Sequence, residues 1–422
     1  MRVAVFLNLL GLGGTEKAAC RWAWGLRDGG HQVTVLTLKD GPRRAELEQH
    51  GVSVRIVSGT ARAVADVLQE VSPDAIHAHA PGHPHEGDLL GAGLALLQEK
   101  IPVVQTNIFG HLYNPMEDAW TDFRLFISWT SCVQAARRVF VPLDEKFFRR
   151  ASVAVYPVDP VEAPSAREIA AFRRRLGVTD DEVLFGRLSR PDLAKWTNLV
   201  TDAFAIALRR HRAIKLLLRE PPPEVTEKLR TSPAARHFII LPATSDPDEL
   251  HLTMAALDVV LHTSSIGESF GYGIAEPMNL GRPVVTHSVP WQDQAQLELV
   301  RHGECGYVAS TPTTMAAALV RLAKDAPLRE QMGFRARQHI RALADPGTSI
   351  ARIERVLRVA AEGGDSPFVA EDLRRAKAAA AYLDTHQFGH GLREKLALYP
   401  FYCRAHFLQW RQAIRLPKAF AA

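Results

Sequence analysis

The sequence lacks long hydrophobic runs and has little cysteine. No run of eighteen apolar residues occurs among the 422 residues, so we expect no transmembrane helix. Residues 1–7 lead directly into a glycine-containing loop and are interpreted as a first strand, not a signal peptide. The four cysteines are widely scattered: Cys20, Cys132, Cys305 and Cys403. This spacing fits no metal or redox site and is typical of a reduced, cytoplasmic protein.

A strong charge of either sign is also missing. The formal net charge is +5, which is too small by itself to indicate a nucleic-acid-binding protein. The contents of 47% hydrophobic and 23% charged residues are those of a soluble globular protein. A chain of this length should fold into two domains, each with its own core.

Residues 258–285 predict a strand, a loop and a helix in succession. Val259 to Leu261 form the end of a short buried strand, and a polar loop with glycine follows. Gly271 to Leu280 has the length and apolar face of a helix. Pro277 removes one helix N–H, which is tolerable only in the first turn and therefore favours a helix start after Gly271. In a parallel α/β sheet, ligands bind where such a strand ends.

Two carboxylates stand at this point of the chain. Glu268 lies at the mouth of the strand-to-helix turn, and Glu276 follows after seven residues, inside the helix. Free N–H groups at a helix start attract anions, and a carboxylate can accept two hydrogen bonds from a vicinal diol. Glu276 is therefore suited to a ribose and Glu268 to a sugar. Two surface carboxylates on an ordinary α/β crossover would show the same spacing.

The wider pattern resembles the Glu-x7-Glu motif of retaining glycosyltransferases of family 4, the group 1 glycosyltransferases. Ser269-Phe270-Gly271 follows the first glutamate, and Gly-x-Pro-Val-Val follows the second. The early run Gly13-Gly14-x-Glu16, with Gly30-His31-x-Val33 after it, is similar to the family's amino-terminal signature. Taken alone, those glycines could equally form a simple tight turn.

This resemblance covers roughly residues 1–345 and implies an α/β GT-B fold. Two Rossmann-like domains with doubly wound parallel sheets would face a cleft. Residues 1–160 would bind the acceptor and 161–345 the nucleotide sugar, and the helices of 346–422 would cross back to the first domain. A Pro-rich segment, 157–164, is suited to the hinge between them. Within the first domain we expect a short strand at Phe126 to Thr130.

The resemblance also implies the donor site. Gly186-Arg187-Leu188 and, further on, Lys195 resemble the family's segment whose Arg and Lys balance a diphosphate as the sugar leaves. Relatives usually have fewer residues between the Arg and the Lys of this segment than this chain does. Either Arg187 or Arg190 could therefore be the partner of Lys195. An exposed basic loop is the alternative.

The remaining donor contacts follow the same family pattern. Glu276 would bind the ribose, and Glu268, with Ser269 and the N–H groups of Phe270 and Gly271, would hold the sugar. From the first domain, Gly13 and Gly14 would close over the phosphates. No metal or other cofactor is expected, because fixed cations can stabilise the leaving group.

The acceptor side is less determined. The run Asp74-x-x-His77-x-His79 resembles the family segment that lines the cleft near the acceptor, although histidines at a buried strand end are an alternative. Many relatives carry a histidine two residues after the threonine that corresponds to Thr106, where this chain has Ile108, so either His79, His111 or Asn107 takes that role or the acceptor is held differently. With His83 and His85 the first run could suggest a metal site, but nearby cysteine is missing and Pro81 and Pro84 make the backbone irregular.

The last 52 residues carry nine Lys and Arg against four acids, together with Phe401, Phe407, Trp410 and Phe420. Such a tail could rest on an anionic membrane, which would suit a lipid-linked acceptor at the inner membrane face. The alternative is an ordinary crossover helix that packs Phe407, Leu408 and Trp410 on the first domain.

We therefore expect a hexosyltransferase-type enzyme that moves a sugar from a nucleotide donor of the UDP or GDP type to an acceptor hydroxyl with retention. The acceptor would be a sugar, a lipid-linked compound or another small molecule, within polysaccharide or glycoconjugate synthesis. Two alternatives stay open: a nucleotide-sugar 2-epimerase of the same fold, and a non-catalytic protein that binds nucleotide sugars or polyanions.

Overall fold

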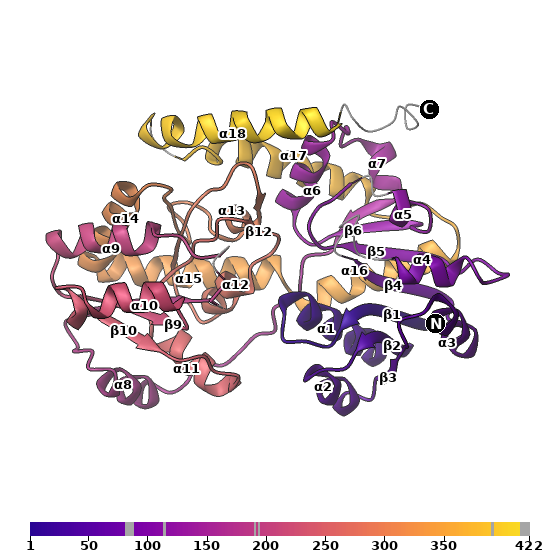
Figure 1. Cartoon of the computed structure of the whole chain (residues 1–422), viewed down its shortest axis with the longest axis horizontal. Coiled ribbons are helices and arrows are strands. Elements are labelled where there is room, and N and C mark those ends of the chain that lie inside the picture. The colour runs from indigo at the N-terminus through magenta and orange to yellow at the C-terminus, as the bar shows by residue number, and fades with distance from the viewer. Residues whose placement is uncertain (81–87, 113–114, 190, 193–194, 390–391, 414–422) are drawn as a thin grey trace. The chain divides into compact units, whose positions relative to one another are not determined.

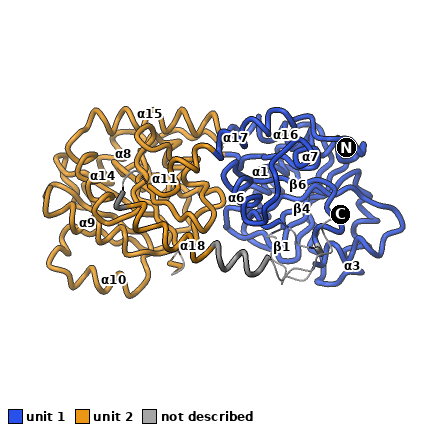
Figure 2. Tube along the Cα trace, turned by 90° about the horizontal axis from the view of Figure 1, so that it is seen from above, with its two compact units in different colours: residues 1–157, 344–380 blue, residues 158–343, 381–422 orange. Residues whose placement is uncertain are grey.

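The computed structural model describes residues 1–80, 88–112, 115–189, 191–192, 195–389 and 392–413. Strands alternate with helices along the chain, as the hydrophobic pattern predicts (Figure 1). The chain divides into two compact units (Figure 2). Unit 1 consists of residues 1–157 and 344–380, and unit 2 of residues 158–343 and 381–422.

Unit 1 is built on a seven-stranded parallel sheet with the order β3-β2-β1-β4-β5-β6-β7. The strands are β1 (Arg2–Leu9), β2 (Gln32–Lys39), β3 (Ser53–Ile56), β4 (Ala75–Ala80), β5 (Val103–Asn107), β6 (Phe123–Phe126) and β7 (Ala151–Val153). The helices between them are α1 (Gly14–Asp28), α2 (Arg43–Gln49), α3 (Ala61–Val71), α4 (Leu89–Leu94), α5 (Pro115–Asp118), α6 (Trp129–Arg138) and α7 (Glu145–Arg149).

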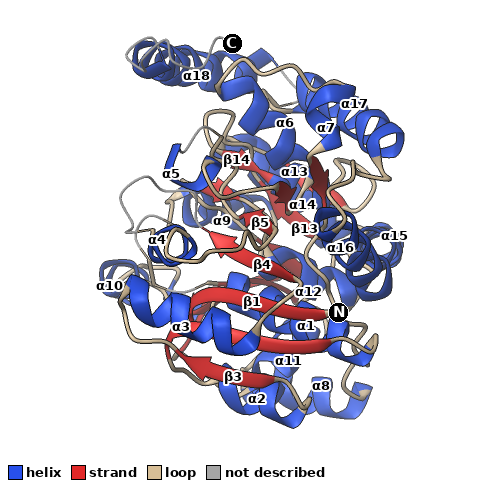
Figure 3. Cartoon of the chain, turned by 90° about the vertical axis from the view of Figure 1, so that its right-hand side faces the viewer, coloured by secondary structure: helices blue, strands red, loops and turns tan. Residues whose placement is uncertain are grey.

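Helices cover both faces of this sheet (Figure 3). Because side chains alternate along a strand, Phe6 of β1 faces the side where Leu68 of α3 completes an apolar core. His77 and His79 of β4 point to the other side, where the Trp22 ring of α1 packs against both imidazoles. Parallel strands connected by helices that cover both faces of the sheet make unit 1 a doubly wound α/β fold.

Unit 2 repeats this architecture with a six-stranded parallel sheet of order β10-β9-β8-β11-β13-β15. The strands are β8 (Val183–Leu188), β9 (Ile214–Arg219), β10 (Phe238–Leu241), β11 (Val259–Leu261), β13 (Val284–Thr286) and β15 (Gly306–Val308), and a separate pair joins β12 (Gly267–Glu268) to β14 (Asp293–Gln294). The helices are α8 (Ala166–Arg175), α9 (Leu199–Arg210), α10 (Pro223–Arg230), α11 (Pro247–Ala256), α12 (Tyr272–Asn279), α13 (Ala295–Leu299), α14 (Pro312–Lys324) and α15 (Ala326–Leu343), with a 3-10 turn η1 (Ala235–His237).

Each sheet reverses its winding direction once. In unit 1 the chain runs outward from β1 to β3 and then returns to place β4 on the other side of β1. In unit 2 it runs from β8 to β10 and returns to place β11 beside β8. The carboxyl ends of β1 and β4, and those of β8 and β11, are therefore the switch points where such sheets bind ligands. The predicted fold class, two α/β units with doubly wound parallel sheets, is confirmed.

Two local predictions were wrong. The strand expected at Phe126 to Thr130 ends at Phe126, because the Ser128 hydroxyl accepts a hydrogen bond from the Ser131 N–H (3.1 Å) and caps α6 from Trp129. Helix α12 does start after Gly271, at Tyr272, where the left-handed Gly271 (φ 103°) is the amino-terminal cap. Pro277 is nevertheless its sixth residue and does not lie in the first turn.

The carboxyl-terminal helices are shared between the units. Helix α16 (Pro346–Ala361) lies in unit 1, where the Ser349 hydroxyl accepts from Trp22 Nε1 (2.9 Å) and donates to the Val155 carbonyl (2.6 Å). Helix α17 (Val369–His386) passes from unit 1 to unit 2, and α18 (Leu392–Ala413) belongs to unit 2. Across the part of the chain that is described, no helix combines the length and apolar character needed to cross a membrane.

Candidate active site

Arg187 is a buried cation near the carboxyl end of β8. Its side chain is held from three directions: Nη1 donates to the Thr263 hydroxyl, Nη2 donates to the Lys195 carbonyl (2.5 Å), and the guanidinium lies 4.1 Å from the centre of the Trp196 ring. The residue is 2% exposed, and burial lowers the pKa of Arg187 to about 10. Among the described residues no carboxylate lies within ion-pair distance of it. Such a buried cation favours an anionic ligand.

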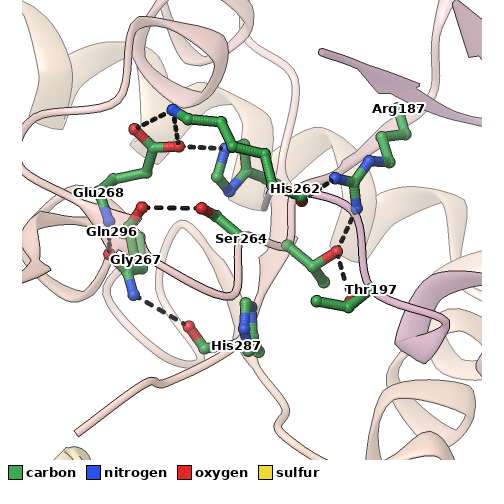
Figure 4. Close-up of polar contacts among 10 residues, drawn as sticks. Arg187, Thr197, His262, Ser264, Gly267, Glu268, His287 and Gln296 are labelled. Carbon is green, nitrogen blue, oxygen red and sulfur yellow. Dashed lines mark hydrogen bonds and ion pairs between the residues drawn. The ribbon is translucent and has the colours of Figure 1, made fainter. Parts of the chain in front are cut away.

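Glu268 receives two positively polarised side chains at the carboxyl end of β11. Lys195 Nζ lies 3.0 Å from Oε1 and 3.3 Å from Oε2 of Glu268, and His262 Nε2 lies 3.2 Å from Oε1 (Figure 4). Thus residues that are far apart in sequence meet at the switch point between β8 and β11. The structure brings together three predicted residues, Arg187, Lys195 and Glu268.

Burial and pairing act on Glu268 in opposite directions. Burial alone would raise the pKa of its carboxyl group, because a low dielectric disfavours the charge. The hydrogen bond and charge of His262, together with the Lys195 ammonium, outweigh burial and lower the pKa of Glu268 to about 2. The group is therefore a carboxylate at neutral pH and can accept hydrogen bonds from hydroxyl groups.

The loop that carries Glu268 has little freedom. A Cβ at Gly267, which adopts a φ of 65°, would lie 1.9 Å from the Asp293 carbonyl, so only glycine allows β12 and β14 to approach. The Glu268 N–H donates to Gln296 Oε1 (3.1 Å), and the Ser269 hydroxyl donates to the Asp293 carboxylate. Contacts within the protein thus fix the backbone on both sides of Glu268.

The other predicted donor residues continue into α12. Phe270 is buried and its ring meets Tyr272 edge-on at 5.0 Å. Gly271 is the amino-terminal cap of the helix, whose first N–H groups point back towards the loop. Glu276 lies in the second turn and is half-buried. Arg190 lies outside the described residues.

In unit 1, the histidines of β4 lie at the other switch point. His77 Nε2 is hydrogen-bonded to the Thr106 hydroxyl (2.7 Å), whereas neither ring nitrogen of the buried His79 has a hydrogen-bond partner in the described chain. Burial lowers the pKa of His77 to about 3 and also lowers that of His79, to which His77 adds repulsion. Both rings are neutral at pH 7, and His79 keeps a donor and an acceptor for a ligand.

His111 and Asn107 form one small loop after β5. Asn107 Nδ2 donates to the His111 carbonyl (2.5 Å) and its Oδ1 accepts from the His111 N–H (3.1 Å). The Asn107 amide is thus used to shape the backbone, which leaves the imidazoles of His79 and His111 as the candidates for the missing family histidine. Ile108, which stands in that histidine's place, is buried.

The glycine loop lies where β1 ends. Gly13 caps α1, and Gly14 is its first residue and is exposed. A Cβ on Gly13 would lie 2.2 Å from Glu16 Oε2, so the Glu16 carboxylate folds over the start of its own helix. His83 and His85 lie outside the described residues. Across the described parts of the chain, no three His, Cys, Asp or Glu side chains gather as a metal site would need.

Three contacts were not predicted from the sequence. His262, Asp293 and Gln296 all support the Glu268 loop. The position of His262 could have indicated its role, because the residue directly follows β11 at the switch point. No sequence pattern indicates that Asp293 and Gln296 lie near Glu268, because only the pairing of β12 with β14 brings them there.

Two family models match the sequence. Residues 13–185 match the model described as glycosyl transferase 4-like domain, and residues 181–325 match the model described as glycosyl transferases group 1. No curated protein matches the chain.

Solved structures share the fold at low sequence identity. HepE from Anabaena, in complex with UDP and glucose, is 20% identical, covers 85% of this chain and 99% of its own, and superposes with a TM-score of 0.68. A glycosyltransferase from Rickettsia africae is 13% identical, with coverages of 85% and 98% and a TM-score of 0.69. WaaG, a glycosyltransferase involved in lipopolysaccharide biosynthesis, is 15% identical, with coverages of 84% and 99% and a TM-score of 0.61. With both family domains present on a GT-B fold, the chain is a group 1 glycosyltransferase.

Proposed function

We propose that this glycosyltransferase belongs to family 4 and moves a hexose from a nucleotide diphosphate sugar to an acceptor hydroxyl with retention at the anomeric carbon. The observation that carries the donor class is Arg187, a buried guanidinium beside Lys195 that has no carboxylate partner in the described chain. A diphosphate would supply the missing negative charge. The Anabaena neighbour was solved with UDP and with UDP-glucose, which supports UDP-sugars as the first donors to test.

In this proposal the positive charges act on the leaving group. As the bond between the anomeric carbon and the diphosphate breaks, negative charge grows on the diphosphate oxygens, and Lys195 and Arg187 stabilise it. Glu268 accepts hydroxyl protons of the sugar in hydrogen bonds, and Glu276 does the same for the ribose. Ser269, Phe270 and Gly271 hold the sugar, and Gly13 and Gly14 contact the phosphates. No metal or other cofactor is required.

For the acceptor we propose the residues of unit 1. His79 offers two buried ring nitrogens without partners in the described chain, and His111 lies in the loop after β5. A sugar, small-molecule or lipid-linked hydroxyl would fit a neutral imidazole that both donates and accepts.

The donor assignment is tested by Glu276→Ala. The variant should lose on the order of 1.5–3 kcal/mol of UDP or GDP binding, because the ribose hydroxyls lose a charged acceptor. Isothermal titration calorimetry with each nucleotide measures this loss, and Glu304→Ala, an exposed carboxylate of the same unit, is the control. Equal affinity in the wild type and Glu276→Ala would rule out the ribose role.

Product analysis separates the alternatives. NMR of the product's anomeric proton reports retention or inversion. A 2-epimerase would interconvert the donor without an acceptor. A non-catalytic protein would bind the nucleotide sugar and turn none over, with or without an acceptor.

A further inference from the structure

The Glu268 carboxylate has one acceptor position that no described residue uses. A carboxylate offers about four lone pairs. Oε1 is engaged by both Lys195 Nζ and His262 Nε2, whereas Oε2 is engaged by Lys195 Nζ alone, at 3.3 Å. The side chain as a whole is 12% exposed. The carboxylate thus has two contacts at Oε1 and a single contact, with Lys195, at Oε2.

His262 is the more rigid of the two side chains that hold Glu268. Its backbone N–H donates to the Val285 carbonyl (3.0 Å), so the residue continues the pairing of β11 with β13. Its side chain is 10% exposed, and its Nδ1 is buried without a hydrogen-bond partner in the described chain. The ring therefore uses Nε2 for its one polar contact, with Glu268. Lys195, in contrast, reaches the carboxylate through a flexible four-carbon stem.

Lys195 cannot serve both ligands of the proposed reaction equally. If its ammonium turns to the leaving diphosphate, the Glu268 carboxylate loses both hydrogen bonds from Lys195 and keeps its contact with His262 Nε2 (3.2 Å). The neighbouring charged or titratable groups are Arg187, which already donates to Thr263 and to the Lys195 carbonyl, and the buried His287 behind His262. His262 is then the remaining described side chain that fixes the carboxylate.

We propose that His262 is a positioning residue for the donor sugar: its Nε2–H holds Oε1 of Glu268, so that Oε2 accepts a hydroxyl of the sugar ring. This inference rests on the proposed function, since it assigns Glu268 to the sugar of the donor. It predicts that His262 affects the sugar and not the nucleotide. It also predicts that any neutral side chain that donates from the Nε2 position can replace the ring.

The test uses two substitutions in the full-length enzyme. His262→Leu removes the donor and keeps an apolar body of similar size, whereas His262→Gln places an amide N–H close to the Nε2 position. His237→Leu is the control, because His237 is also buried in unit 2 and bonded to a backbone carbonyl (Ile214, 3.0 Å), away from the switch point. Thermal unfolding shows which variants are folded. The affinities for UDP and for UDP-sugar, and kcat/KM for the UDP-sugar, are then measured.

We expect His262→Leu to lower kcat/KM for the nucleotide sugar by about 10- to 100-fold, as for the loss of a hydrogen bond to a charged group. Its UDP affinity should stay within about twofold of the wild type, and His262→Gln should recover most of the activity. Full activity in His262→Leu, or an equal loss for UDP and UDP-sugar, would overturn the inference while the proposed function stands. If the wild type itself neither binds nor turns over any nucleotide sugar, the proposed function fails, and the role of His262 fails with it.

If His262→Leu does not fold, a second measurement decides. The thermal stabilities of His262→Asn, whose shorter side chain loses the Nε2 contact, of Glu268→Gln and of the double variant form a cycle that isolates their interaction. A coupling between the two sites supports the contact. Additive effects, together with unchanged sugar affinity in His262→Asn, would overturn the role.

Discussion

At the scale of single residues, the paired charges of Lys195 and Glu268 decide what the site can do. In the structure the ammonium lies on the carboxylate, next to a guanidinium that already donates to Thr263 and to the Lys195 carbonyl. Arg187 therefore also shapes the loop that carries Lys195. When a diphosphate binds, the Lys195 ammonium would exchange the Glu268 carboxylate for a phosphate oxygen, and Glu268 would keep its contact with His262. Neither charge would then be buried without a partner.

Lys195→Ala should lower kcat by about 100- to 1,000-fold and change donor affinity much less. The reason is that negative charge on the diphosphate grows only as the sugar leaves, so the loss falls on the transition state. Steady-state kinetics with a UDP-sugar measures both parameters. Lys215→Ala is the matched control, because Lys215 is also paired with a glutamate of unit 2 (Glu182, 3.2 Å) but lies near the amino end of β9, at the opposite ends of the strands from the site. A change in KM alone would make Lys195 a binding residue or a bystander.

Glu268 should make stability depend on pH at the acid end. Its pKa is depressed from 4.5 to about 2 in the folded protein, so its stabilising contribution is present above pH 4.5 and disappears as the pH falls towards 2. The full contribution is on the order of 3 kcal/mol. We expect the free energy of urea unfolding to differ between wild type and Glu268→Gln at pH 5, and this difference to shrink by about half as the pH is lowered to 3. Glu304→Gln should follow the wild type throughout, and a constant difference for Glu268→Gln would contradict the pairing.

At the scale of elements, α18 holds unit 2 with one face and leaves apolar side chains on another. The buried Glu394 carboxylate accepts hydrogen bonds from the Ser310 N–H (2.6 Å) and the Thr314 hydroxyl (2.7 Å). Leu398, four residues later in the helix, is also buried. Leu396 and Tyr399 are 66% and 57% exposed, and the cations Lys395 and Arg404 are exposed as well. The side chains of Phe407, Leu408, Trp410 and Phe420 lie outside the described residues.

We propose that this face of α18 rests on an anionic membrane, because exposed apolar residues beside cations suit its surface. Leu396→Ser with Tyr399→Ser should reduce co-sedimentation with anionic liposomes at low salt by several-fold, and high salt should weaken wild-type binding. Phe334→Ser removes a similarly exposed side chain (61%) from α15 and serves as the control. Deletion of residues 400–422, which removes Arg404 and keeps Leu396 and Tyr399, should weaken binding and leave a folded enzyme. If the wild type does not co-sediment with anionic liposomes at low salt, α18 has a structural role only and the membrane proposal fails.

At the scale of the whole molecule, the chain crosses between its two units three times, after residues 157, 343 and 380. Unit 1 is therefore incomplete without a segment that follows unit 2 in sequence. Besides Ser349, this segment supplies Arg352, whose Nη1 donates to the Ser152 hydroxyl (3.0 Å) and to the Asp372 carboxylate (2.6 Å). Asp372 is fully buried, so this pairing stabilises unit 1 only while both partners are present.

A fragment of residues 1–157 should thus fail to unfold cooperatively. The same residues joined through a short Gly-Ser linker to 344–380 should show one urea transition, because Trp22, Val155 and Ser152 regain their partners. Circular dichroism during urea titration measures both proteins. Adding Asp372→Ala to the linked protein should lower its unfolding free energy by about 3 kcal/mol, whereas a cooperative transition of 1–157 alone would show that the segment is dispensable.

The sequence by itself determined the two α/β units, because hydrophobic alternation and glycine positions mark where parallel strands end. Arg187, Lys195 and Glu268 were named as donor residues through the family resemblance, and the structure brings these three side chains together. Local capping was harder to foresee, since Ser128 turned an expected strand into a helix start.

Only the tertiary structure decided which side chains support the site. The contacts of His262, Asp293 and Gln296 with the Glu268 loop depend on the pairing of β12 with β14 and on the register of β11, and neither leaves a periodic trace in the sequence. The division of the carboxyl-terminal helices between the units was decided in the same way. Their hydrogen bonds join residues nearly 200 or more positions apart, a separation over which local patterns carry no information.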